Sequence, residues 1–158
     1  MKRRDARELV LKSLFAWEME KGDPFRQLAY IAGDEEMSGF DMNGLEEHSP
    51  PEEDGFVRRL LAGITENKTE LDAIIADYAR DWDLSRLGGA ERNVLRMGIF
   101  EMLYDEKLPP AVAINEAVDL IKKYGSDEAA GFINGILDNH ELRRDGFVQD
   151  YRERRSGQ

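Results

Sequence analysis

The segment from Leu108 to Asn139 carries start and stop signals for two consecutive short helices. Pro109-Pro110 opens the first helix, because the fixed φ angle of proline suits a helix entry. Gly125 is expected to end that helix in the left-handed conformation. Ser126 is expected to cap the next helix, with acidic residues following in its first turn. The segment therefore predicts one closely connected helix pair.

Apolar residues recur at helical spacing in at least five segments of the chain, whereas the alternation typical of strands is weak throughout. The first expected helix spans about Arg4 to Lys21 and stops before Gly22-Asp23-Pro24. Its apolar stripe comprises Ala6, Val10, Leu14 and Trp17, widened by Leu11 and Phe15. Further helices are expected at about 24–36, 51–67, 70–80, 89–105, 110–124 and 127–138. The fold class is therefore all-α with about seven helices.

Local helix chemistry predicts two further details. Thr69 has an acid, Asp72, three residues later, so we expect Thr69 to cap the fourth helix. Gly98 lies inside the fifth helix, which is the most apolar. Because glycine destabilises a helix interior by about 1 kcal/mol relative to alanine, a close helix–helix approach is the expected reason for it.

Polar residues inside these helices are expected to make structural contacts. Asn115 and Asn134 lie next to apolar residues, so we expect buried amides that bond to neighbouring backbone. Arg96 and Glu101 are five residues apart on one helix and do not face each other. Each is therefore expected to pair with another element.

The acidity of the chain is concentrated in one segment. The formal net charge is −11, but residues 34–54 contain nine acids and no lysine or arginine. The other 137 residues carry 24 acids and 22 bases, so the body is nearly neutral. The acidic segment, with a loop at about 37–52, is expected to be a solvated insertion, or else a cover over the basic N-terminal helix.

Composition excludes several classes of site. The chain has no cysteine and only two histidines, far apart, which argues against disulfides, cysteine-based metal sites and a histidine triad. No nucleophile–base pair or phosphate-cradling glycine loop is present, so we expect neither catalysis, nor a metal, nor a cofactor. The absence of a signal peptide, a membrane span and cysteines favours the cytoplasm.

The chain resembles the NusB family of bacterial transcription antitermination factors over about residues 2–140. The segment Ala113-Ile114-Asn115-Glu116-Ala117 is the specific part of the resemblance. The other matching residues are Arg3 to Glu8 with Trp17, Leu60 to Gly63, Glu91, Val94 to Arg96, Phe100-Glu101, Pro109, Val112, Lys122, Tyr124-Gly125, Phe132, Asn134-Gly135 and Leu137-Asp138.

The resemblance implies a noncatalytic protein made of two small packed helical bundles. Such a protein would bind the boxA element of ribosomal RNA leader transcripts together with NusE, a small-subunit ribosomal protein. The pair would join the elongating RNA polymerase. We expect one domain over residues 1–142, with subdomains at about 1–80 and 81–142, followed by a flexible charged tail at 143–158. A homodimer is possible, since relatives differ in oligomeric state.

The resemblance and the helical phase predict an RNA contact at Lys2, Arg3, Arg4 and Arg7. The three arginines extend the apolar stripe of the first helix past its N-terminal end, where their guanidinium groups are expected to be free. A planar guanidinium can engage phosphate oxygens in pairs. The alternative is a charge run that only solubilises a frayed terminus.

Phe132 is the second candidate RNA contact, because an exposed aromatic ring can stack on an unpaired base. It is also a candidate partner contact with Glu91 and Glu128, which match family positions near NusE. The alternatives are a core position for Phe132 and helix-dipole carboxylates for the two acids. The preceding Ala129-Ala130-Gly131 replaces the polar or basic residues of relatives, which disfavours a charge-based RNA contact here.

Two other functions remain open from the sequence. One is an RNA-binding appendage related to those of ribosomal RNA cytosine methyltransferases. The other is a helical scaffold that binds only protein, which would be consistent with the net charge of −11.

Overall fold

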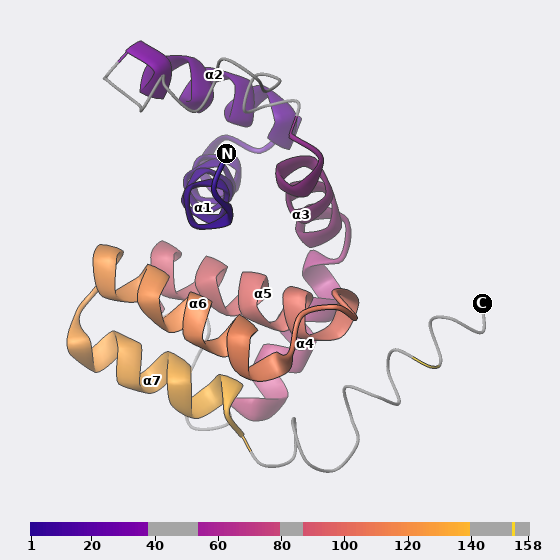
Figure 1. Ribbon diagram of the computed structural model, residues 1–158, viewed down its shortest axis with the longest axis vertical. Coiled ribbons are helices and arrows are strands. Elements are labelled where there is room, and N and C mark those ends of the chain that lie inside the picture. Colours follow the sequence, from indigo (N-terminus) through magenta and orange to yellow (C-terminus); the bar gives the residue numbers. More distant parts are fainter. Residues whose placement is uncertain (38–53, 80–86, 140–152, 154–158) are drawn as a thin grey trace. The chain divides into compact units, whose positions relative to one another are not determined.

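The computed structural model of the chain describes residues 1–37, 54–79, 87–139 and 153, and every element in these ranges is a helix (Figure 1). The predicted all-α class is confirmed. The helices are α1 (Arg3–Glu20), α2 (Pro24–Met37), α3 (Gly55–Glu66), α4 (Lys68–Tyr78), α5 (Gly89–Tyr104), α6 (Pro110–Tyr124) and α7 (Asp127–Leu137). None of these helices combines the length and hydropathy of a membrane span. Nearly all of the acidic loop at about 37–52 and of the charged tail at 143–158 lies outside the described ranges.

The chain divides into two compact units, one from Met1 to Glu66 and one from Asn67 onward. The sequence placed this boundary near residue 80, whereas the structure assigns α4 to the second unit. The reason is that α4 packs against α5 and buries Leu71, Ile74 and Ile75.

In the first unit α1 packs against both α2 and α3. Four residues of the predicted stripe are buried: Ala6, Val10, Leu11 and Leu14. Trp17 is only half-buried and Phe15 is 47% exposed, so the assignment of Phe15 to the core was wrong. Leu9 and Ser13 widen the buried face at the opposite edge of the stripe from Phe15. The core residues of this unit are Ala6, Leu9, Val10, Leu11, Leu14, Leu28, Ala32, Val57, Leu60, Leu61 and Ile64.

The predicted stop of the first helix is confirmed. The N–H of Lys21 donates to the carbonyl of Trp17 at 2.7 Å, and Lys21 and Gly22 both have positive φ angles (60° and 82°). The indole N–H of Trp17 donates to the carbonyl of Gly22 at 3.0 Å, which holds the turn against the helix. Asp23 then accepts the N–H of Phe25 at 3.0 Å at the start of α2.

In the second unit α5 is central, because every residue from Asn93 to Leu103 is buried. Helices α6 and α7 pack on α5 and on each other. A Cβ atom on Gly98 would lie 2.9 Å from Cδ1 of Leu137 and 3.4 Å from Cβ of Ala117. The predicted close approach at Gly98 is therefore confirmed, and both neighbouring helices take part in it.

The predicted helix caps are partly confirmed. The Ser126 hydroxyl accepts the N–H of Ala129 at 3.0 Å, as expected. Gly125 does not adopt the left-handed conformation, because its φ angle of −133° is that of extended backbone. Thr69 is not a cap either, since α4 begins at Lys68 with Asn67 before it. The cap of α3 was not predicted from the sequence: the Asp54 carboxylate accepts the N–H groups of Phe56 and Val57 at 2.9 and 3.2 Å.

Candidate RNA and protein interfaces

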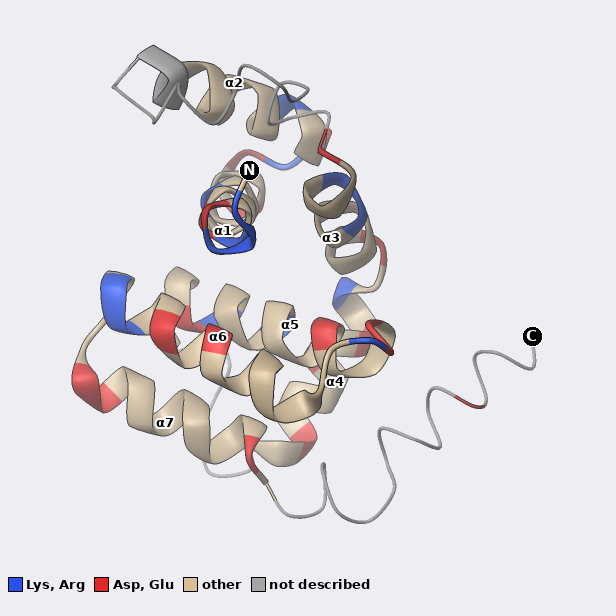
Figure 2. Ribbon diagram, viewed as in Figure 1, with Lys and Arg blue, Asp and Glu red and all other residues tan. Residues whose placement is uncertain are grey.

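The basic residues predicted to contact RNA form the first turns of α1 in the first unit (Figure 2). Lys2, Arg3 and Arg4 are exposed, so their charged groups can reach a ligand. Arg7 differs, because it is only 5% exposed. The expectation of a free guanidinium group is therefore wrong for Arg7, and its direct contact with RNA stays a prediction.

Phe56, in the first turn of α3, explains where these guanidinium groups lie. The guanidinium carbon of Arg3 is 4.6 Å from the centroid of the Phe56 ring, and that of Arg7 is 5.3 Å from it. A cation within about 6 Å of a ring centroid is attracted by the negative π face. Phe56 thus holds two arginines of α1 against α3. Phe56 is not among the RNA contacts predicted from the sequence.

Helix α3 adds two exposed arginines that were not predicted as RNA contacts from the sequence, Arg58 and Arg59. The guanidinium carbon of Arg58 lies 4.6 Å from the centroid of the Phe25 ring on α2. Arg58 therefore joins α3 to α2, in the same manner as Phe56 joins α3 to α1. Blue segments in Figure 2 show that α1 and α3 both carry basic residues.

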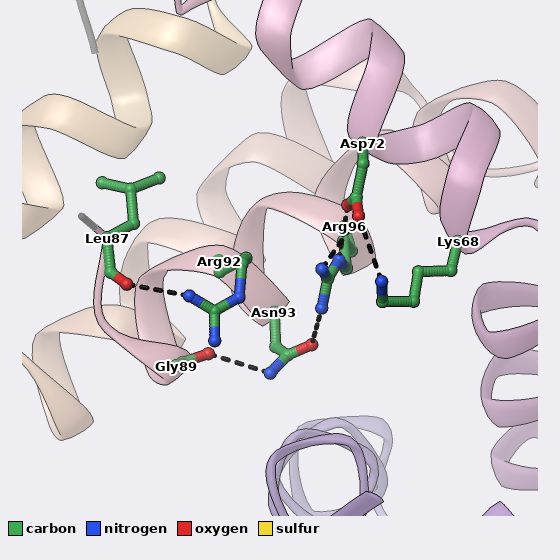
Figure 3. A network of polar contacts seen from close by, with 7 residues as sticks. All are labelled: Lys68, Asp72, Leu87, Gly89, Arg92, Asn93 and Arg96. Atoms are coloured by element: carbon green, nitrogen blue, oxygen red, sulfur yellow. Dashed lines mark hydrogen bonds and ion pairs between the residues drawn. The ribbon is translucent and has the colours of Figure 1, made fainter. Parts of the chain in front are cut away.

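A polar network in the second unit ties α4 to the start of α5 (Figure 3). Arg96 donates from Nε and Nη2 to the two carboxylate oxygens of Asp72, at 2.6 and 3.0 Å. The expectation that Arg96 pairs with another element is confirmed. Lys68 adds an exposed ion pair to the same carboxylate at 3.4 Å.

Asn93 extends this network into the first turn of α5. Its side-chain oxygen accepts from Nη1 of Arg96 at 2.8 Å, and its amide nitrogen donates to the carbonyl of Gly89 at 2.9 Å. Nearby, Arg92 donates to the carbonyl of Leu87 at 2.9 Å. Because these side chains bond to backbone carbonyl oxygens, the network has a structural role. This role of Asn93 was not predicted from the sequence.

The predicted buried amides were misplaced. Asn115 and Asn134 are both exposed, whereas Asn93 is fully buried. The apolar neighbours of Asn115 in the sequence turn inward, and the helix presents position 115 to the other side. Proximity to apolar residues along the chain therefore did not indicate which amide the core encloses.

The predicted partner residues lie on α5 and α7, which start at the same end of the second unit (Figure 1). Glu128 is exposed in the first turn of α7, and half-buried Phe132 follows one turn later on the same face. The carboxylate of Glu91 folds back over Gly88 at the start of α5. The structure thus puts Glu128 and Phe132 together, while Glu91 adopts the position of a carboxylate near a helix N-terminus.

No group of three or more acidic or histidine side chains in the described ranges could hold a metal ion.

A comparison with protein families gives a match to the NusB family over residues 4–141. The chain belongs to the NusB family. It is 37% identical over 137 residues to the transcription antitermination protein NusB of Symbiobacterium thermophilum, covering 87% of each chain. It is 41% identical over 138 residues to NusB of Thermodesulfovibrio yellowstonii, covering 87% of this chain and 90% of that protein.

Solved NusB structures share the fold. The structure of T. maritima NusB matches with a TM-score of 0.71 and 34% sequence identity, over 87% of this chain and 89% of that one. A crystal structure of the antitermination factors NusB and NusE in complex with double-stranded RNA matches with a TM-score of 0.69 and 26% identity. That match covers 86% of this chain and 92% of that one.

Proposed function

We propose that this chain is a noncatalytic transcription antitermination factor that binds boxA-type ribosomal RNA leader sequence together with NusE. The observation that carries the proposal is the exposed basic start of α1 in a member of the NusB family. Lys2, Arg3 and Arg4 offer three cations to RNA phosphates, and phosphate neutralisation supplies most of the affinity in such complexes. A related NusB has been crystallised with NusE and RNA, which supports the same assembly here.

The partner surface in this proposal comprises Glu128 and Phe132 on α7, with Glu91 at the start of α5. Glu128 is a solvated carboxylate that can accept hydrogen bonds from a basic ribosomal protein. Phe132 adds apolar area beside it. The complex of the chain, NusE and RNA would then join the elongating RNA polymerase in the bacterial cytoplasm.

The relatives favour this function over the alternatives from the sequence. The curated relatives are named transcription antitermination proteins, and the chain spans 87 and 90% of the two described above. Relatives with a regulatory name also support the proposal that the chain is not an enzyme.

The test is RNA binding with NusE present, measured by fluorescence anisotropy with a labelled single-stranded boxA RNA at several salt concentrations. Neutralising Lys2, Arg3 and Arg4 together to glutamine should weaken binding and reduce the salt slope by about 2, at about 0.7 per phosphate contact. The matched control neutralises Lys21, Arg26 and Lys107, which are also exposed, and should leave the slope unchanged.

Two results would contradict the proposal. If the wild-type chain binds no boxA RNA with or without NusE, the scaffold that binds only protein is favoured. If both triple variants lose the same affinity, binding depends on net charge alone, and the start of α1 is not the RNA site.

A further inference from the structure

We propose that Arg59 of α3 is a further RNA-phosphate contact, so that the RNA surface of the first unit continues from α1 onto α3. This inference rests on the proposed function and extends its binding site to a helix that neither the sequence nor the comparisons assigned to RNA. Three observations carry it: the Phe56 contact, the helical phase of α3, and the exposure of Arg59.

The Phe56 ring brings the two helices together at the basic site. Arg3 reaches from the first turn of α1 to within 4.6 Å of the ring centroid, and Arg7 approaches to 5.3 Å from the next turn. The first turn of α3 therefore borders the exposed cations of α1. Any cation on the same flank of α3 as Phe56 adds to that positive surface.

The helical phase puts Arg59 on this flank. At about 100° per residue, Arg59 is rotated by only about 60° from Phe56, and residues three apart are neighbours on a helix surface. Arg58 is rotated by about 160° from Phe56. The position of its guanidinium over Phe25 of α2 confirms that Arg58 lies on the opposite flank. Arg58 therefore faces α2, whereas Arg59 lies on the flank of α3 that carries Phe56.

Arg59 is also available to a ligand. It is exposed, and within the described part of the chain no ion pair, hydrogen bond or cation–π contact joins its guanidinium group. The nearest acid in sequence, Asp54, is occupied as the cap of α3. Two of the core residues of α3, Leu60 and Leu61, fix the orientation of the helix because both are buried.

The chemistry of this surface fits a phosphate backbone. It presents several cations from two helices, whereas a single carboxylate ligand would need one or two. Guanidinium groups bind phosphate oxygens in pairs and are always charged. A strand that contacts Lys2, Arg3 and Arg4 on α1 would meet Arg59 on passing over the start of α3.

The test compares Arg59→Gln with Arg58→Gln in the full chain, with NusE and a labelled single-stranded boxA RNA as the probe. Both variants lose one exposed positive charge from the same helix. Arg59→Gln should weaken binding about 1.5-fold to fivefold, the range for one exposed charge pair, and lower the salt slope by about 0.7. Arg58→Gln should leave both unchanged, and Arg59→Lys should retain most of the affinity. Thermal melts of each variant check that the fold is kept.

The outcomes separate this inference from the proposed function. If the wild-type chain binds RNA but Arg59→Gln binds equally well, Arg59 is not a contact, while the function stands. If Arg58→Gln and Arg59→Gln lose the same affinity, the loss reflects net charge and the inference is wrong. If the wild-type chain binds no RNA, the proposed function itself fails.

Discussion

Arg96 of α5 donates two hydrogen bonds to the Asp72 carboxylate of α4, at 2.6 and 3.0 Å, across a separation of 24 residues. The Arg96 side chain is 3% exposed and that of Asp72 is 27% exposed. A nearly buried guanidinium with two aligned acceptors needs both of them, because no water can replace a lost partner. This pair explains why α4 belongs with α5 in the second unit.

Arg96→Ala should lower the free energy of unfolding by about 2 to 3 kcal/mol. The loss lies below the full range for breaking a buried ion pair, because Asp72 remains partly solvated. Lys68→Ala is the matched control, since Lys68 pairs with the same carboxylate at 3.4 Å but its side chain is 39% exposed. It should cost less than about 1 kcal/mol in urea denaturation. Equal losses for the two variants would show that burial does not govern the pair.

Asn93→Ala should destabilise the protein by about 1 to 3 kcal/mol, because it removes a buried amide that accepts a hydrogen bond from Arg96 and donates one to the Gly89 carbonyl. Asn115→Ala, on the exposed side of α6, should change stability by less than about 0.5 kcal/mol. Chemical denaturation of both variants measures the difference. A larger loss for Asn115→Ala would contradict the assigned burial.

Gly98→Ala should destabilise by about 1 kcal/mol. The gain in helix propensity, about 1 kcal/mol, is exceeded by the overpacking of a Cβ at 2.9 Å from Leu137 and 3.4 Å from Ala117. Gly131→Ala is the control, because that exposed helical glycine has open space around its Cβ position, and it should stabilise by up to about 1 kcal/mol. Thermal unfolding gives both values, and a stabilised Gly98→Ala would show that Leu137 moves aside freely.

Ser126→Ala should lower stability by about 1 kcal/mol, because α7 loses the hydroxyl that accepts the Ala129 N–H. Ser126→Asp, which supplies another side-chain acceptor, should restore most of the loss. Thr69→Ala tests the corrected assignment of α4, where no side chain caps the helix. We expect it to change the unfolding midpoint far less than Ser126→Ala does.

Phe56→Leu should weaken RNA binding about twofold to fivefold, because leucine keeps the apolar packing but removes the π face beneath Arg3 and Arg7. Phe25→Leu is the matched control, since that ring supports Arg58 on the other flank of α3. Fluorescence anisotropy with boxA RNA and NusE measures the effect. If both variants bind equally well, the ring contributes only packing.

The sequence predicted the elements well because helix boundaries depend on local chemistry. Pro109-Pro110, Ser126 and the Gly22-Asp23-Pro24 stop all act on the backbone within a few residues of themselves. The predicted cap at Thr69 and the predicted left-handed conformation of Gly125 were both wrong. Both residue types are common at helix ends, so the sequence favoured these roles. In the structure α4 already begins at Lys68, and Gly125 follows α6 in extended backbone.

The candidate sites were predicted less completely. The basic start of α1 could be read from one helical wheel, and the exposed positions of Arg3 and Arg4 match it. The burial of Arg7 and its cation–π contact with Phe56 could not be predicted in this way, because Phe56 lies about fifty residues further along the chain. For the same reason the sequence predicted that Arg96 pairs with another helix but did not identify Asp72 as its partner.

The sequence by itself determined the helical class, the order of the helices and the family, since apolar periodicity and local signature residues suffice for them. Only the tertiary structure decided which polar side chains are enclosed and which are offered to a ligand. It buried Asn93 rather than Asn115, and it placed the guanidinium group of Arg58 over the Phe25 ring of α2. The physical reason is that burial and pairing depend on the neighbouring helix, whereas periodicity reports only the face that a helix turns toward its core.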